Sequence, residues 1–180
     1  PRPGADSTPM RTEATEPMAT AGGGVRSPRV VLVAPEIPQN TGTIGRLCVC
    51  TGAPLHLVRP LGFDLSESRI RRAGLDYWQH LDLQVHENWE SFLRDASPER
   101  MVFATAHAER TVYDIDFQVG DFLVFGNETS GLPPDFYARY ADSLATIPMP
   151  GPHARTHNLA NAVSIVLYEA IRQLGGYAQS

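Results

Sequence analysis

Two polar loops in the second half of the chain carry residue types that could hold a planar ligand. One reads GNETSGLP and follows the apolar run from Phe122 to Phe125, and the other reads IPMPGPHARTHN. Gly126 and Gly131 allow close approach of the backbone, so that peptide groups can hydrogen-bond the edges of a ligand. The same glycines could instead serve only to form tight turns. The pattern predicts a ligand pocket built from loops at strand ends.

Glu128 is the acidic residue of the first loop, and its position allows two roles. It either accepts backbone N–H groups and braces the loop, or it contacts a ligand or an arginine. Either role places Glu128 near the pocket.

The basic residues are all arginine, fifteen in number, which excludes Schiff-base chemistry and a lysine general base. The formal net charge of −5 argues against a protein coated with nucleic acid, although local clusters can still bind phosphate. Arg69, Arg71 and Arg72 form one such cluster. It is either a phosphate-binding surface or a solvated face of a loop or helix.

Several common functional motifs are absent from the sequence. There is no G-x-G-x-x-G after the first apolar run, no P-loop and no G-x-S-x-G elbow, so the ordinary nucleotide folds and serine hydrolases are disfavoured. His153 and His157 could share a helical face, but Gly151-Pro152 favours a loop, and we expect no metal site. Cys48 and Cys50 lack a second pair that would complete a zinc site, so we expect two reduced, buried thiols.

The length of 180 residues and the hydrophobic content of 42% allow one well-buried domain, which we place at residues 29–180. Residues 1–28 contain no aromatic residue, leucine or isoleucine, and we expect a disordered tail. This tail resembles neither a secretory signal nor a transit peptide, and no later stretch is apolar enough to span a membrane. We therefore expect a cytoplasmic protein.

The elements that must position these residues follow from apolar periodicity. A polar stretch over residues 63–77 predicts a loop with at most one helical turn. Buried strands are predicted over residues 29–33, 55–58, 101–105, 122–125 and 144–147. Helices are predicted over residues 43–51 with Asn40 or Thr41 as cap and Gly52 as stop, after Asn88, over 134–140, and from a cap at Asn158 to Gly175-Gly176. The sequence predicts an α/β fold with a mainly parallel sheet of five or six strands and helices on both faces.

Four segments together resemble a known family: PEIPQNTGTIGRLC, RRAGLDYW, FGNETSGLP and NLANAVSIVLYEA. They are similar to the SPOUT class of S-adenosylmethionine-dependent RNA methyltransferases, and most similar to its TrmL group, which 2'-O-methylates wobble cytidine or uridine in tRNA. The resemblance runs from Val30 to Gly175. It implies a deep C-terminal trefoil knot, a homodimer, S-adenosyl-L-methionine as cofactor and the anticodon stem-loop of tRNA as partner.

The resemblance also implies roles for individual residues. Arg46 would hold the ribose and its adjacent phosphate, and Asn40 would fix the active-site loop. The residues implied to hold the cofactor are Ala104, Thr105, Gly126, Glu128, Gly131, Ile147, Met149 and Thr156. The residues implied to contact RNA are Arg69, Arg71, Arg72, Arg155 and Tyr168. Two positions depart from the family pattern, since Thr156 replaces a serine and His157 an apolar residue.

Three questions stay open at the level of sequence. The substrate could be another tRNA or rRNA position within the same class. The chain could also be a catalytically inactive module that binds RNA or cofactor. The proton acceptor for the ribose hydroxyl could be Tyr168, water or phosphate.

Overall fold

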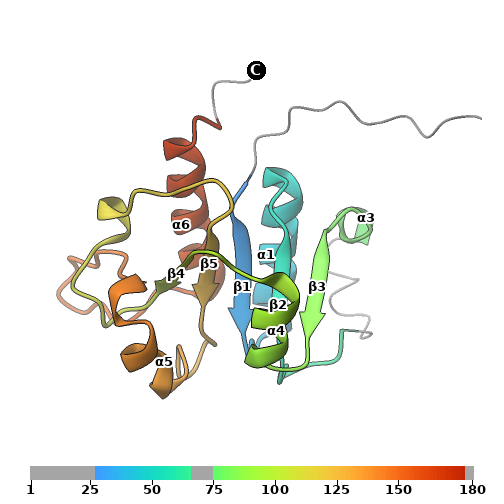
Figure 1. Cartoon of the computed structure of the whole chain (residues 1–180), viewed down its shortest axis with the longest axis horizontal. Coiled ribbons are helices and arrows are strands. Elements are labelled where there is room, and N and C mark those ends of the chain that lie inside the picture. Colours follow the sequence, from blue (N-terminus) through green and yellow to red (C-terminus); the bar gives the residue numbers. More distant parts are fainter. Residues whose placement is uncertain (1–26, 66–74, 177–180) are drawn as a thin grey trace, which may run out of the picture.

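The structure is a computed structural model that describes residues 27–65 and 75–176. Within these residues, six parallel strands form one sheet in the order β3-β2-β1-β5-β4-β6. Figure 1 shows β1 to β5 side by side in this sheet. The strands are β1 (Arg29–Val33), β2 (Leu55–Val58), β3 (Leu83–His86), β4 (Met101–Ala104), β5 (Phe122–Phe125) and β6 (Leu144–Ala145). The helices are α1 (Pro38–Thr51), α3 (Leu75–Trp78), α4 (Trp89–Ala96), α5 (Pro134–Arg139) and α6 (Leu159–Gln173), with 3-10 turns η1 (Val112–Asp114) and η2 (Ala141–Ser143). The predicted parallel α/β fold is confirmed, whereas the knot stays a prediction.

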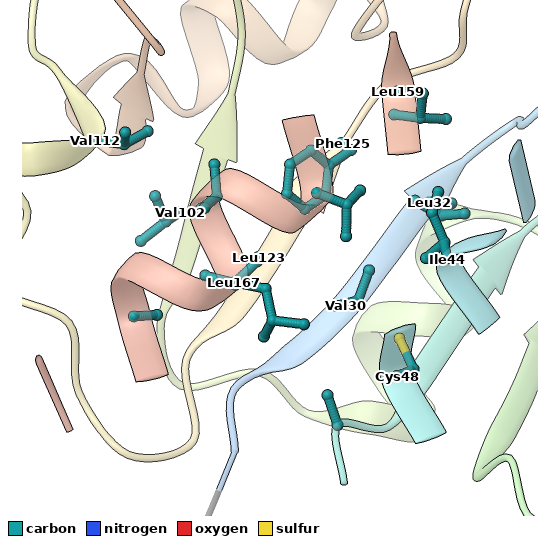
Figure 2. Close-up of a cluster of buried hydrophobic side chains, with 14 of the residues drawn as sticks. Val30, Leu32, Ile44, Cys48, Val102, Val112, Leu123, Phe125, Leu159 and Leu167 are labelled. Atoms are coloured by element: carbon teal, nitrogen blue, oxygen red, sulfur yellow. The ribbon is translucent and has the colours of Figure 1, made fainter. Parts of the chain in front are cut away.

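Both faces of the sheet are covered because the strand side chains alternate between two cores. Val30 and Leu32 pack with α1 and α6 on one face, and Figure 2 shows this cluster. Val31 and Val33 face the other way, into a core with aromatic side chains from α4, α5, β4 and β5. Among the described residues, no helix has the length and apolar character needed to cross a membrane.

The start of α1 differs from the prediction. The helix begins at Pro38, because proline lacks an N–H and suits the first helical position. Asn40 and Thr41 are therefore not caps but buried residues of the first turn, and the cap position belongs to Ile37. The predicted stop is confirmed, since Gly52 has a left-handed φ of 67°.

The edge strand β3 was not predicted. Its central residues, Gln84 and Val85, are exposed, so the strand lacks the apolar run that identified the others. The last predicted strand also ends earlier than expected, after Ala145, and α5 ends at Arg139. The Asn88 cap is confirmed, because its side chain accepts a hydrogen bond from the Ser91 N–H at 2.8 Å.

The structure also changes two other predictions, the end of the N-terminal tail and the burial of the two cysteines. Ser27 and Pro28 were assigned to the tail, yet both are buried, and the Ser27 hydroxyl donates to the Thr51 carbonyl at 2.7 Å. Cys48 is buried, and burial raises the pKa of its thiol to about 12. Cys50 is exposed, so the expectation of two buried thiols is wrong for one of them.

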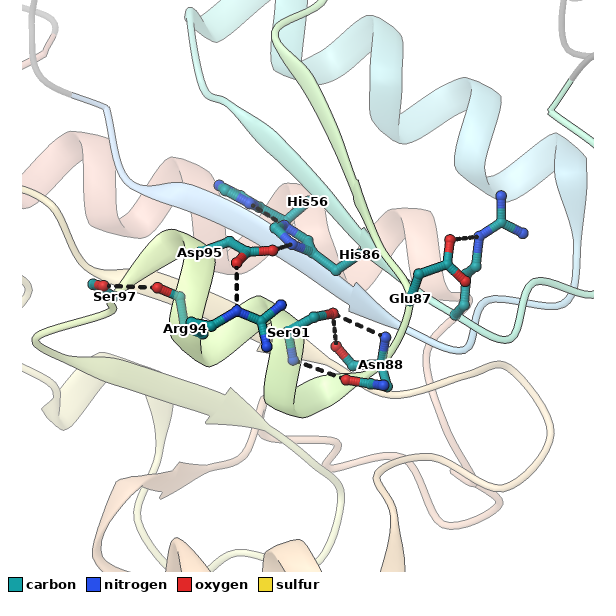
Figure 3. A network of polar contacts seen from close by, with 9 residues as sticks. His56, His86, Glu87, Asn88, Ser91, Arg94, Asp95 and Ser97 are labelled. Atoms are coloured by element: carbon teal, nitrogen blue, oxygen red, sulfur yellow. Dashed lines mark hydrogen bonds and ion pairs between the residues drawn. The ribbon is translucent and has the colours of Figure 1, made fainter.

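A buried histidine pair, His56 and His86, lies between the sheet and α4 (Figure 3). The His56 Nδ1 and His86 Nε2 atoms lie 3.0 Å apart, and His86 Nδ1 lies 3.8 Å from the Asp95 carboxylate. Burial, followed by the charges of His86 and Arg29, lowers the pKa of His56 to about 4. Burial also lowers the pKa of His86. The pair is therefore neutral at pH 7, with one ring donating and the other accepting.

Candidate functional site

A pocket of about 500 Å³ lies at the carboxyl ends of the central strands. Its walls come from the loops after β4, β5 and β6, from the start of α1, and from the segment that leads into α6. This is the edge at which open parallel sheets bind ligands, and the volume suits a small-molecule ligand.

Nine of the predicted site residues converge on this pocket. The residues that line it are Asn40, Ala104, Thr105, Gly126, Glu128, Gly131, Ile147, Met149 and Thr156. They come from segments up to 116 positions apart in the sequence, between Asn40 and Thr156. The prediction that these loops meet around one cavity is confirmed, whereas their contact with a cofactor stays a prediction.

The remaining predicted residues do not line the pocket. Arg46 is exposed on α1, Arg155 is exposed in the loop before α6, and Tyr168 is exposed on α6. The arginine cluster (Arg69, Arg71 and Arg72) lies outside the described residues. Across 27–65 and 75–176, no cluster of three or more histidine, cysteine, aspartate or glutamate residues is placed to hold a metal.

The turn after β5 requires glycine for its own packing. A Cβ atom on Gly126 would lie 2.0 Å from the carbonyl carbon of Gly131, and Gly131 has a φ of 73°. The Asn127 and Gly131 backbones exchange two hydrogen bonds of 3.0 and 3.2 Å, which close the turn. The tight-turn explanation of these glycines therefore holds whether or not a ligand approaches them.

Glu128 braces the pocket by joining the turn after β5 to the start of α1. Its carboxylate accepts hydrogen bonds from the N–H groups of Glu36 at 2.8 Å and Ile37 at 3.2 Å. It also accepts one from the Asn40 amide at 3.0 Å. A second link between the same loops is the hydrogen bond from the Thr129 hydroxyl to the Glu36 carboxylate. The bracing role predicted as one alternative for Glu128 is thus observed.

Sequence reasoning missed several polar residues of the pocket, among them Tyr137 and Asn158. Tyr137 on α5 reaches it, and its hydroxyl lies 3.2 Å from the Thr105 hydroxyl. Asn158 was predicted only as a helix cap, yet its amide also donates to the Asn40 side-chain oxygen at 3.0 Å. Nothing in the local sequence around Tyr137 marks it as a pocket residue, because only the fold brings α5 beside β4.

Helix α3 packs against α1 close to Arg46. The Tyr77 hydroxyl donates to the Gly42 carbonyl at 2.8 Å. Trp78 lies so close to α1 that a Cβ atom on Gly45 would be 2.8 Å from its ring. Burial raises the pKa of Tyr77, and the opposing, smaller effect of the Arg46 charge indicates that the two side chains are near each other.

Comparisons with known proteins agree with this geometry. A tRNA (cytidine(34)-2'-O)-methyltransferase of Saccharophagus degradans is 45% identical over 148 residues, which are 81% of this chain and 95% of the relative. A solved structure that concerns the 2-OH methylation of C/U34 on tRNA has a TM-score of 0.78 and 46% identity, covering 84% of this chain and 99% of that one. The AdoMet-bound rRNA methyltransferase of Sinorhizobium meliloti has a TM-score of 0.73 and 31% identity, covering 84% of this chain and 61% of that one. The SpoU rRNA Methylase family matches residues 27–168, and the chain therefore belongs to this family.

Proposed function

We propose that this protein transfers a methyl group from S-adenosyl-L-methionine to the ribose 2'-hydroxyl of the wobble nucleotide, position 34, in tRNA. The nucleotide would be cytidine or a modified uridine. The observation that carries the proposal is the convergence of nine predicted residues on one pocket at the carboxyl end of the sheet. The tRNA (cytidine(34)-2'-O)-methyltransferase and the C/U34 methylation structure to which the chain is similar support the choice of substrate.

The pocket fits a ligand that is partly aromatic and partly polar. Apolar side chains such as Phe125, Leu132 and Ile147 line it beside hydroxyl and amide groups. Gly131 and Tyr137 also line the pocket, and the Gly131 φ of 73° favours glycine at this position. S-adenosyl-L-methionine has this mixed character. We assign its binding to the eight lining residues other than Asn40.

The chain's own residues would bind and orient the reactants, and the cofactor supplies an electrophilic methyl group when bound. Arg46 would clamp the ribose and the adjacent phosphate and would stabilise charge that develops on the attacking oxygen. A guanidinium stays protonated, so Arg46 would not accept the hydroxyl proton. Asn40 would hold the first turn of α1 against the pocket through its hydrogen bond with Glu128.

The position of Arg46 supports a homodimer. Arg46 lies about 9 Å further along α1 than Asn40 and on a different face of the helix, given 1.5 Å and 100° per residue. Asn40 lines the pocket, whereas Arg46 lies outside the pocket and is exposed to solvent. We propose that a second copy of the chain completes the active site at this surface.

RNA contact is proposed for the exposed arginines and for Tyr168, which is 41% exposed. Arg155 belongs to the loop that enters the pocket wall, so it could bind backbone phosphates next to the reacting nucleotide. Contact with the anticodon stem-loop is also proposed for Arg69, Arg71 and Arg72. We further propose one methyltransferase domain at 29–180 with a C-terminal trefoil knot, and a cytoplasmic location, where tRNA is found.

The test is to incubate the protein with isotopically labelled S-adenosyl-L-methionine and unmodified tRNA transcripts, and to locate the methyl group by mass spectrometry of nuclease fragments. We expect the label on the ribose of nucleotide 34. A label at another tRNA or rRNA position would support a different member of the family. Binding of S-adenosyl-L-methionine without any transfer would indicate an inactive module.

A further inference from the structure

Three side chains form a continuous hydrogen-bonded relay around the pocket: Asn158, Asn40 and Glu128. The Asn158 Nδ2 atom donates to Asn40 Oδ1 at 3.0 Å, and Asn40 Nδ2 donates to Glu128 Oε1 at 3.0 Å. These residues lie before α6, in the first turn of α1, and in the turn after β5. The relay therefore ties together three loops that are distant in sequence.

The direction of this relay is fixed by chemistry. A carboxylate only accepts hydrogen bonds, so the Asn40 amide must present its NH₂ group to Glu128 and its oxygen to Asn158. Asn158 must then donate to Asn40 with its NH₂ group. Its own oxygen is left to face the start of α6, where it accepts from the N–H groups of Ala160 at 2.9 Å and Asn161 at 3.4 Å. A flip of either amide would bring two acceptors or two donors together.

We infer that Asn158 is a positioning residue for the proposed methyl transfer, in addition to being the cap of α6. Asn40 is only 8% exposed, so water cannot readily replace a lost partner of its oxygen. By holding Asn40, Asn158 fixes the first turn of α1, and with it the helix that carries Arg46, against the pocket wall. This inference rests on the proposed function, because positioning is measured through the transfer reaction.

The alternative is that Asn158 only caps α6, and one substitution separates the two roles. Asn158→Asp keeps a side-chain oxygen for capping, since aspartate and asparagine cap helices about equally well. It removes the NH₂ donor and places a carboxylate against the Asn40 oxygen. The matched control is Asn88→Asp at the cap of α4. The Asn88 oxygen also accepts from a backbone N–H, but Asn88 does not line the pocket.

We expect Asn158→Asp to remain folded, because the favourable interaction of a negative charge with a helix N-terminus offsets part of the cost of the lost hydrogen bond to Asn40. Its kcat should fall at least about tenfold, the loss expected from an unmatched buried hydrogen-bonding group. The dissociation constant for tRNA should stay within about twofold of that of the wild type, and Asn88→Asp should keep the wild-type kcat. Wild-type kcat in Asn158→Asp would overturn the inference.

A second variant guards against an effect of the added charge or of misfolding. Asn158→Ser also keeps a capping oxygen, but it is neutral and too short to reach Asn40, so it should lose kcat similarly. Combining Asn158→Ser with Glu128→Gln should cost less than the product of the two single losses, because both act on Asn40. Multiplicative losses, or unfolding of both Asn158 variants, would refute a positioning role. Absence of transfer by the wild type would instead refute the proposed function.

Discussion

Replacing Gly126 with alanine tests whether the turn after β5 is part of the cofactor site. The new Cβ atom would lie 2.0 Å from the Gly131 carbonyl carbon, 2.1 Å from its oxygen and 2.3 Å from the Leu132 nitrogen. These are backbone atoms, and ordinary contact begins at about 3.4 Å, so the two sides of the turn must separate by more than 1 Å. Both hydrogen bonds between Asn127 and Gly131 would then weaken. Two hydrogen bonds at about 1 kcal/mol each, with an overpacking cost of about 1–3 kcal/mol, give a destabilisation of about 3–5 kcal/mol.

The assay combines urea denaturation with calorimetric titration of S-adenosyl-L-methionine. A domain with a stability of about 5–15 kcal/mol should remain folded at low temperature after Gly126→Ala, but its affinity for S-adenosyl-L-methionine should fall by at least about a hundredfold. Gly151→Ala is the matched control, because a Cβ atom there would meet no other atom within 4 Å. Wild-type affinity in a folded Gly126→Ala variant would refute the assignment of this turn to the cofactor site.

Three further predictions follow from the site and the core. Arg46→Ala should reduce methyl transfer at least about a hundredfold and leave calorimetric binding of S-adenosyl-L-methionine intact, because Arg46 lies outside the pocket; full activity would exclude its proposed role. Tyr77→Phe should lower the free energy of unfolding in urea by about 1 kcal/mol, since it removes the hydrogen bond to Gly42; an unchanged value would show that this bond contributes nothing. The pKa of His56 is about 4 in the folded state, below its usual 6.5, so between these pH values the unfolded chain binds a proton that the folded protein does not. The free energy of unfolding should therefore fall as the pH is lowered from 6.5 to 4. The decrease in the free energy of unfolding amounts to up to about 3 kcal/mol. His56→Leu should flatten this part of the curve of unfolding free energy against pH. An identical slope in that variant would assign the titration to other groups.

The sequence predicted those parts of the fold whose signals are local. The strands β1, β2 and β5 are apolar runs buried on both faces, and their predicted bounds match the structure. Strand β3 was missed because it lies at the sheet edge and exposes Gln84 and Val85. Edge strands bury less side-chain surface, so they leave a weaker pattern in the sequence.

The site was predictable to the extent that a family resemblance identified its loops. Residue spacing alone did not reveal that Asn40 lies within the first turn of α1, and not at its cap, and that its side chain hydrogen-bonds to Glu128 and Asn158. The proline signal for an earlier start of α1 was present at Pro38, and it outweighs the capping preference of Asn40. The second role of Asn158 depends on a contact across 118 positions, which no local pattern encodes.

The most direct test of the proposed function uses two anticodon stem-loop RNAs that differ in one oxygen atom. One carries ribose at nucleotide 34, and the other carries 2'-deoxyribose there. We predict methyl transfer from S-adenosyl-L-methionine to the first RNA and none to the second, with similar binding of both. Equal transfer to the two RNAs would contradict methylation of the 2'-hydroxyl of nucleotide 34.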